Sequence, residues 1–246
     1  MMPNSAYHFD WTFMWGEPGL RLLDGLQVTL ELSVCALCGG LLLGVVFGMV
    51  RWLDWRVTAP ACWLYVELAR NTPPVVQIMF WYFSASWILP TALFLQLRDT
   101  GLEFVAAAFA LALYHGAFYA EILRAGLNAV PKGQYEAARV LGIRMPRTIA
   151  TIVLPQMGPI IVPALINETV ALIKNTSLAM AIGVTELTFQ YRYIDSYDFR
   201  GTEALVAVTV LYMIICCLAS AGGHRLDSLF SRRRTAPLPA ARQEQA

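Results

Sequence analysis

Long apolar stretches alternate with short polar ones along most of the chain. Five of them are long enough to be read as membrane-crossing helices, since a crossing needs ~20 mainly apolar residues. In order, they cover residues 25–52, 73–90, 102–123, 149–173 and 204–222. The pattern therefore predicts an all-α integral membrane protein with five transmembrane helices.

Glycines in the first apolar stretch indicate how it packs. Gly40, Gly44 and Gly48 recur at every fourth position, so they share one face of a helix. Small residues at this spacing let two helices approach closely in lipid. We therefore expect this face to lie against another crossing helix.

The start of the second crossing is predicted from its capping residues. Thr72 is a suitable N-cap, and Pro73 is well tolerated in a first helical turn, where its missing N–H costs nothing. We expect this helix to begin near Pro73. The preceding residues 57–69 are then expected to form a separate helix lying at the membrane interface.

Composition supports a membrane protein and excludes several other classes. The 246 residues are 57% hydrophobic and 14% charged, with a mean hydropathy of +0.54, whereas soluble domains average ~25% charged residues. A net charge of +1 does not suggest a nucleic-acid partner. No Lys or Arg precedes Arg21, so we expect no cleavable signal peptide.

Catalytic and metal-binding signatures are not found in the sequence. Cys35 and Cys38 have C-x-x-C spacing but lie in an apolar helix without a second pair, where cysteine acts as a small apolar residue. The three histidines are far apart. Lys132 and Lys174 are the only lysines, and neither belongs to a P-loop. We predict a protein that is not an enzyme and has no metal or cofactor.

The distribution of Lys and Arg predicts an orientation, because basic residues concentrate on the cytoplasmic side. One side would hold 12 of the 18 basic residues: Arg51, Arg56, Arg124, Lys132, Arg139, Arg144, Arg147, Arg225, Arg232, Arg233, Arg234 and Arg242. The opposite side would hold five: Arg21, Arg98, Lys174, Arg192 and Arg200, with Arg70 at a boundary. We therefore expect a periplasmic N-terminus, a cytoplasmic C-terminus and a cytoplasmic loop between the third and fourth crossings.

That loop contains an arginine-rich pattern. Its marked positions are Glu136, Ala137 and Ala138, then after three residues Gly142, and after nine more Ile152, Leu154 and Pro155. We expect a short helix over 134–140 and a second helix starting at 145–147. Gly142 accepts backbone angles that other residues resist, so the chain can bend sharply there. The loop would form an exposed elbow.

The spacing E-A-A, three residues, Gly, nine residues, I-x-L-P resembles the EAA signature of ABC-importer permease subunits. Further stretches make the chain similar to the HisM-type permeases of polar amino-acid ABC importers over nearly its whole length: 23–30, 66–73, 120–126, 131–134 and 174–179. Residues 65–90 and 172–183 look most like glutamate/aspartate permease subunits. One departure is Pro159, where the family often has arginine.

The resemblance implies a set of partners. They are a second permease subunit, identical or not, two ATPase subunits on the cytoplasmic side and a periplasmic solute-binding protein that delivers a polar amino acid. Residues 25–222 would form an ABC transmembrane type-1 domain in a bacterial inner membrane, with an extracytoplasmic segment 1–24 and a cytoplasmic tail 223–246. Residues implied in coupling to the ATPases are Gln134, Glu136, Ala137, Ala138, Arg139, Gly142 and Arg144.

Polar groups at membrane depth mark a candidate translocation path. Ionisable groups there cost about 2.5–3.5 kcal/mol each on insertion scales, so they line cavities or pair. Our hypothesis places five residues beside the path, two in the fourth crossing and three just after it: Asn167, Glu168, Lys174, Thr176 and Ser177. The alternative is that these residues pair helices or form a gate.

Three other ionisable residues have simpler explanations. Glu121 and Arg124 are three apart on one helix, which favours a local ion pair. His115 is predicted to be an interior histidine with hydrogen-bond partners.

Two functions of other classes compete with an ABC permease. A self-sufficient secondary transporter or channel needs internal repeats or ion-coupling carboxylates, and the chain has no visible repeat. An intramembrane enzyme needs a catalytic constellation, for which the sequence shows no motif.

Overall fold

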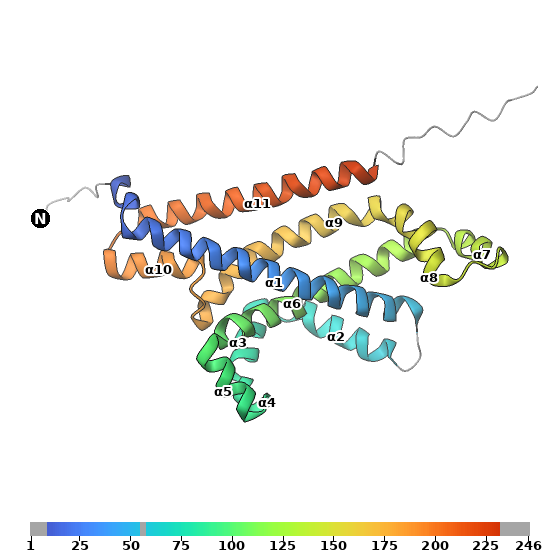
Figure 1. Cartoon of the computed structure of the whole chain (residues 1–246), viewed down its shortest axis with the longest axis horizontal. Helices are drawn as coiled ribbons and strands as arrows, with labels where there is room; N and C mark the ends of the chain where they lie inside the picture. The colour runs from blue at the N-terminus through green and yellow to red at the C-terminus, as the bar shows by residue number, and fades with distance from the viewer. Residues whose placement is uncertain (1–8, 55–57, 232–246) are drawn as a thin grey trace, which may run out of the picture.

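The computed structural model describes residues 9–54 and 58–231, and every element in these ranges is helical. The elements are η1 Trp11–Trp15, α1 Glu17–Leu53, α2 Ala59–Asn71, α3 Pro74–Phe83, α4 Ala85–Ile88, α5 Thr91–Thr100, α6 Leu102–Ala129, α7 Lys132–Val140, α8 Met145–Thr148, η2 Ile149–Val153, α9 Leu154–Asn175, η3 Thr176–Ile182, α10 Leu187–Asp198 and α11 Gly201–Ser231. They form an elongated body with α7 at one tip and α10 toward the other (Figure 1). Arg56, Arg232–Arg234 and Arg242 lie outside the described residues.

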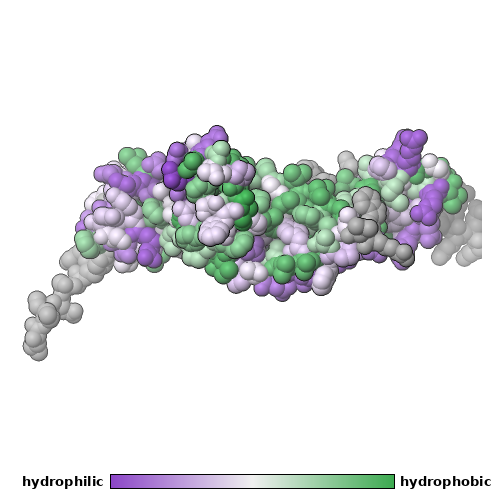
Figure 2. Space-filling view, turned by 90° about the horizontal axis from the view of Figure 1, so that it is seen from below, coloured by the Kyte–Doolittle hydropathy of each residue, from purple (hydrophilic) through white to green (hydrophobic). Residues whose placement is uncertain are grey.

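Four helical segments are long and apolar enough to cross a membrane: Glu17–Leu53, Leu102–Ala129, Met145–Ile182 and Gly201–Arg225. They confirm long helices at the predicted first, third, fourth and fifth crossings. Figure 2 shows apolar residues mostly over the middle of the body and polar residues toward its ends. A helix with apolar residues all round needs an apolar environment, which here is lipid. α11 continues to Ser231, so the start of the predicted tail at 223 is helical.

The prediction of one helix over 73–90 is wrong. α3 ends at Phe83, and α4 and α5 follow as separate short helices. The helix expected at the membrane interface is α2, which packs along α6 through Val66 and Ala69. α3 continues in the same direction along α6, where the Trp81 ring meets Phe109 at 4.9 Å between centroids. α2 and α3 therefore form one interrupted segment antiparallel to α6.

Side chains satisfy the carbonyls that this interruption exposes. Thr72, expected as an N-cap, ends α2, and its hydroxyl donates to the Leu68 carbonyl at 2.8 Å. Asn71 Nδ2 donates to the Glu67 carbonyl at 2.8 Å. Gln77 Nε2 reaches back from α3 to the Ala69 carbonyl, also at 2.8 Å. Unsatisfied backbone groups are costly in lipid, so these bonds allow a proline break inside an apolar layer.

α1 and α6 make the most extensive helix contact of the fold. Gly40, Gly44 and Gly48 are buried, and their face lies against α6 as predicted. A Cβ added at Gly44 would overlap Cβ of Tyr119, and one at Gly48 would lie 2.9 Å from the Ala120 carbonyl oxygen. The two backbones therefore come close enough to exclude side chains larger than hydrogen.

Glu186 ties three helices together at the tip opposite α7. It is fully buried and caps the N-terminus of α10, accepting hydrogen bonds from the backbone N–H groups of Thr188 at 2.8 Å and Phe189 at 2.9 Å. Tyr212 of α11 donates to the same carboxyl at 2.8 Å. Next to it, the Leu187 N–H donates to Thr29 Oγ1 of α1 at 3.1 Å. Burial raises the pKa of Glu186 to about 7, outweighing these hydrogen bonds, which lower it.

We predict that Gly44→Val destabilises the protein by ~1–3 kcal/mol, because overpacking a close contact forces backbone shifts. The measurement is thermal unfolding of the purified protein in detergent. Gly222→Val is the matched control, since no atom lies within 4 Å of a Cβ added there. Equal melting temperatures for the two variants would show that the α1–α6 approach does not need glycine.

We predict a pH-dependent stability that Glu186→Gln removes. The pKa of Glu186 is raised above its ordinary 4.5, so the folded chain keeps this proton where the unfolded chain has lost it. Stability from this group is therefore complete below pH 4.5 and falls as pH rises toward and through about 7. Melting temperatures of wild type and variant at pH 5 and pH 8 test this. Glu136→Gln, at an exposed site, should keep the wild-type slope.

Candidate functional site

The predicted elbow is present, and its bend has a defined hydrogen-bond pattern. α7 covers the expected helix and ends with Ile143 N–H donating to the Ala138 carbonyl at 2.9 Å and Gly142 N–H donating to the Arg139 carbonyl at 3.0 Å. Gly142 has φ +71°. This is a Schellman motif with a left-handed glycine. The Schellman motif explains why Gly142 follows Ala138 by four positions. Ala138 is the C3 residue of the motif, and Gly142 is its C′ residue.

α7 is held against the ends of α1 and α6. The Tyr135 hydroxyl donates to the Leu127 carbonyl at 2.8 Å, and its ring packs 5.5 Å from that of Trp52. Ala138, one of the residues implied in coupling, is buried at 1% exposure and so packs within the chain. The helix periodicity turns Ala138 toward the body and leaves Ala137 outside.

The outer face of the elbow combines charge with two exposed apolar side chains. Among the residues predicted for coupling, those exposed here are Gln134, Glu136, Ala137, Arg139, Gly142 and Arg144. Val140 and Leu141 are 87% and 74% exposed, and our sequence reasoning did not single them out. Their exposure could have been inferred from the sequence, where this apolar pair ends a short polar helix. Exposed apolar residues rimmed by charges are typical of a protein-binding surface.

The elbow leads into a continuous helical arm. α8, η2, α9 and η3 follow one another from Met145 to Ile182 without an intervening loop. Thr148 is buried, and its hydroxyl donates to the Arg144 carbonyl at 3.3 Å. The π-turn η2 directly precedes Pro155, which has no N–H for the next turn. The elbow is therefore joined to α9 without an intervening loop.

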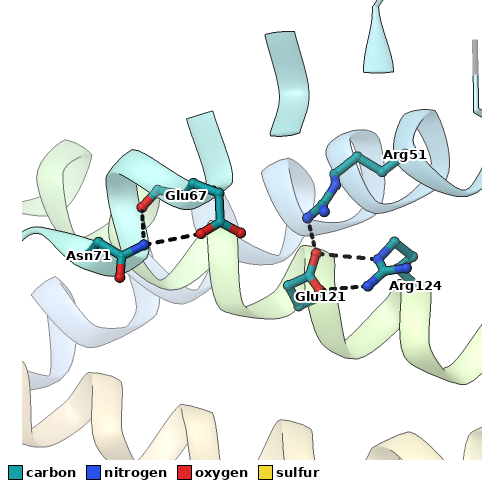
Figure 3. Close-up of polar contacts among 5 residues, drawn as sticks. All are labelled: Arg51, Glu67, Asn71, Glu121 and Arg124. Atoms are coloured by element: carbon teal, nitrogen blue, oxygen red, sulfur yellow. Dashed lines mark hydrogen bonds and ion pairs between the residues drawn. The ribbon is translucent and has the colours of Figure 1, made fainter. Parts of the chain in front are cut away.

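An ion-pair cluster joins α1 to α6 near the elbow. Figure 3 shows Glu121 of α6 contacting two arginines, Arg51 of α1 and Arg124 of its own helix. The Arg124 Nη2–Glu121 Oε2 distance is 3.0 Å, which confirms the predicted local pair. Arg51 was expected only among the basic residues of the cytoplasmic side, and its side chain is 12% exposed. The sequence did not predict Arg51 as a partner of Glu121, because Arg51 belongs to another helix.

A second polar cluster lies between α6 and α9. His115 is fully buried, and its Nδ1 lies 2.6 Å from Glu168 Oε1. Its Nε2 lies 3.2 Å from Asn175 Nδ2. The prediction of an interior histidine with partners is confirmed. Glu168 therefore makes a helix–helix contact, and its side chain is still 17% exposed.

The other residues of the hypothetical path do not join this cluster. Asn167 and Lys174 are exposed and seven positions apart, which places them on a different face of α9 from Glu168. Thr176 is buried and donates to the Ile173 carbonyl at 2.6 Å. The Ser177 hydroxyl donates to the Lys174 carbonyl at 2.7 Å. Of these five residues, Glu168 is the one that contacts His115 in the described part of the chain.

Similarity to known proteins extends over most of the chain. A family model for the binding-protein-dependent transport system inner membrane component matches residues 37–231. The glutamine transport system permease protein GlnP of Escherichia coli K12 is 38% identical over 220 residues, covering 89% of this chain and 96% of that protein. The glutamate/aspartate import permease protein GltJ of the same strain is 32% identical over 196 residues, covering 78% and 80%.

A solved structure agrees with these relatives. It is described as an amino acid ABC transporter with histidines, and it matches with a TM-score of 0.74 at 30% identity, covering 92% of this chain and all of that one.

These matches place the chain among multi-pass proteins of the inner membrane, in transport systems that include an ATPase and a binding protein. They exclude the self-sufficient transporter and the intramembrane enzyme, since a permease subunit is not itself catalytic. The chain belongs to the family of binding-protein-dependent transport system inner membrane components, and it is the permease subunit of an ABC importer.

Proposed function

We propose that this permease carries a polar amino acid, with glutamine as the first candidate, from a periplasmic binding protein into the cytoplasm. Two permease subunits would form the core, and two ATPase subunits would bind their elbows. The observation that carries the proposal is the elbow itself, a rigid bend that presents Val140 and Leu141 and continues into the α8–η3 arm.

Sequence identity supports the choice of substrate. The glutamine permease is 38% identical to this chain, whereas the glutamate/aspartate permease GltJ is 32% identical and covers less of it. Our sequence-based expectation favoured glutamate or aspartate. We therefore put glutamine first and keep the acidic amino acids as the second candidates.

The proposed membrane topology has five crossings. They are α1, the interrupted pair α2 and α3, α6, the arm from α8 to η3, and α11. The elbow end carries the basic residues Lys132, Arg139, Arg144 and Arg147, which supports a cytoplasmic elbow. α11 runs toward the elbow end, whereas α1 starts at the α10 end (Figure 1). This supports a periplasmic N-terminus and a cytoplasmic C-terminus.

We place the translocation path beside Glu168. Its carboxylate is partly exposed at the α6–α9 contact, and the arm connects it directly to the elbow. Asn167 and Lys174 lie on another face of α9 and can border the path only where a second subunit closes it. ATP-driven movement of the ATPases would displace the elbow and, through the arm, change the surroundings of Glu168.

The substrate is tested by uptake into proteoliposomes that contain the permease with its ATPase and binding protein. We expect ATP-dependent accumulation of radiolabelled glutamine that unlabelled glutamine suppresses more strongly than glutamate or arginine. Uptake without ATP, driven by an ion gradient, would contradict the proposal. If glutamate suppresses the uptake more strongly than glutamine, the permease carries acidic amino acids instead.

Coupling is tested by a matched pair of glycine variants. Gly142→Val places a β-branched residue at φ +71°, which costs ~1–2 kcal/mol and shifts the start of α8. Gly133→Val is the control, because it lies in α7 without positive φ, and neither site has an atom within 4 Å of an added Cβ. We expect only Gly142→Val to lower uptake and copurification of the ATPase. Equal activity of both variants would show that the bend is not needed for coupling.

A further inference from the structure

The His115 ring has a different hydrogen-bond partner on each nitrogen, and both partners come from α9. Glu168 Oε1 lies 2.6 Å from Nδ1, and Asn175 Nδ2 lies 3.2 Å from Nε2. Glu168 and Asn175 are seven positions apart, so they share the face of α9 that meets α6. His115 itself is fully buried, which fixes the ring between the two helices.

The contact with Asn175 determines where the ring proton lies. An amide nitrogen donates and cannot accept, so Nε2 must be the acceptor. The single proton of the neutral ring is then on Nδ1, which donates to Glu168. A doubly protonated ring would set two donors, Nε2–H and the amide, against each other. The arrangement therefore has the Nδ1–H of His115 donating to one oxygen of Glu168.

The carboxylate keeps an accessible side. The Glu168 side chain is 17% exposed, and no hydrogen bond to its Oε2 is found within residues 9–54 and 58–231. The other link between the same helices, Tyr119 Oη to Thr169 Oγ1 at 3.4 Å, does not involve it. His115 thus holds one oxygen and leaves the other available to a cation.

We propose that His115 and Asn175 are positioning residues for substrate binding, which hold one oxygen of the Glu168 carboxylate so that the other is directed to the ammonium group of the transported amino acid. The proposal rests on the proposed function, in which Glu168 borders the path. Asn175 acts through His115 by keeping Nε2 without a proton. A positively charged His115 would neutralise Glu168 and remove the attraction.

Uptake kinetics with purified complexes test the role of His115. Glu168→Gln and His115→Leu should each raise KM for the amino acid on the order of tenfold, the expected effect of losing a hydrogen bond to a charged group. His115→Asn keeps an amide N–H near the position of Nδ1 and should restore most of the affinity. Tyr119→Phe is the matched control, because it removes the other α6–α9 side-chain bond and should leave KM unchanged.

The Asn175→Asp variant tests the proton position directly. A carboxylate at 175 accepts from Nε2–H, so His115 should become doubly protonated and KM should rise as in Glu168→Gln. The ¹⁵N spectrum of the ring separates the two forms. The chain has three histidines, so replacing His8 and His224 by glutamine leaves the two nitrogen signals of the His115 ring. We expect the Nδ1–H form in wild type and the charged form in Asn175→Asp.

Each outcome has a separate meaning. If glutamine uptake is absent and another solute is carried, the proposed substrate fails. If uptake is normal but Glu168→Gln has no effect, the placement of the path fails. If Glu168→Gln raises KM while His115→Leu does not, or if wild-type His115 carries its proton on Nε2, the positioning role is overturned. Copurification of the ATPase checks that each variant assembles, and the spectrum decides the case even for a variant with poor assembly.

Discussion

The contact between α1 and α6 organises the described part of the molecule, because α6 also receives α2, α3 and α9. Lipid tails are as apolar as the helices, so burial of apolar surface gives little net attraction between helices in a membrane. Close backbone approach supplies the missing attraction through dispersion contacts. The face of Gly40, Gly44 and Gly48 allows that approach, and Arg51 with Glu121 adds a charged link near the elbow.

The same helix positions both functional regions. The end of α6 binds the elbow through the Leu127 carbonyl and Tyr135, and its middle presents His115 to Glu168. The arm from Met145 to Ile182 connects the two regions on the other side. In the proposed mechanism, a movement of the elbow relative to α6 would change the contact between α6 and α9.

Polar groups at the breaks and ends of the helices either pair with one another or satisfy exposed backbone groups. Gln77, Asn71 and Thr72 satisfy carbonyls at the break between α2 and α3. Glu186 is surrounded by three hydrogen-bond donors at the opposite tip. Because an unsatisfied polar group in lipid costs several kcal/mol, these partners are required wherever the chain departs from a plain helix.

Local sequence was sufficient for the long helices and for the elbow. Four crossings follow from runs of apolar residues, and the bend follows from the spacing of Ala138 and Gly142, because a Schellman motif involves only neighbours in the chain. The interior position of His115 follows from the free-energy cost of placing an ionisable side chain in lipid. The pairing of Glu121 with Arg124 follows from their spacing of three residues on one helix.

Only the tertiary structure decided which distant residues meet. Arg51 reaches Glu121, Asn175 reaches His115, and α2 lies along α6. Such partners depend on how each helix is rotated and shifted against its neighbours. That register results from the packing of all helices together, so no stretch of sequence specifies it alone. Hydrogen bonds within one helix turn, in contrast, are determined by residues that the chain itself keeps adjacent.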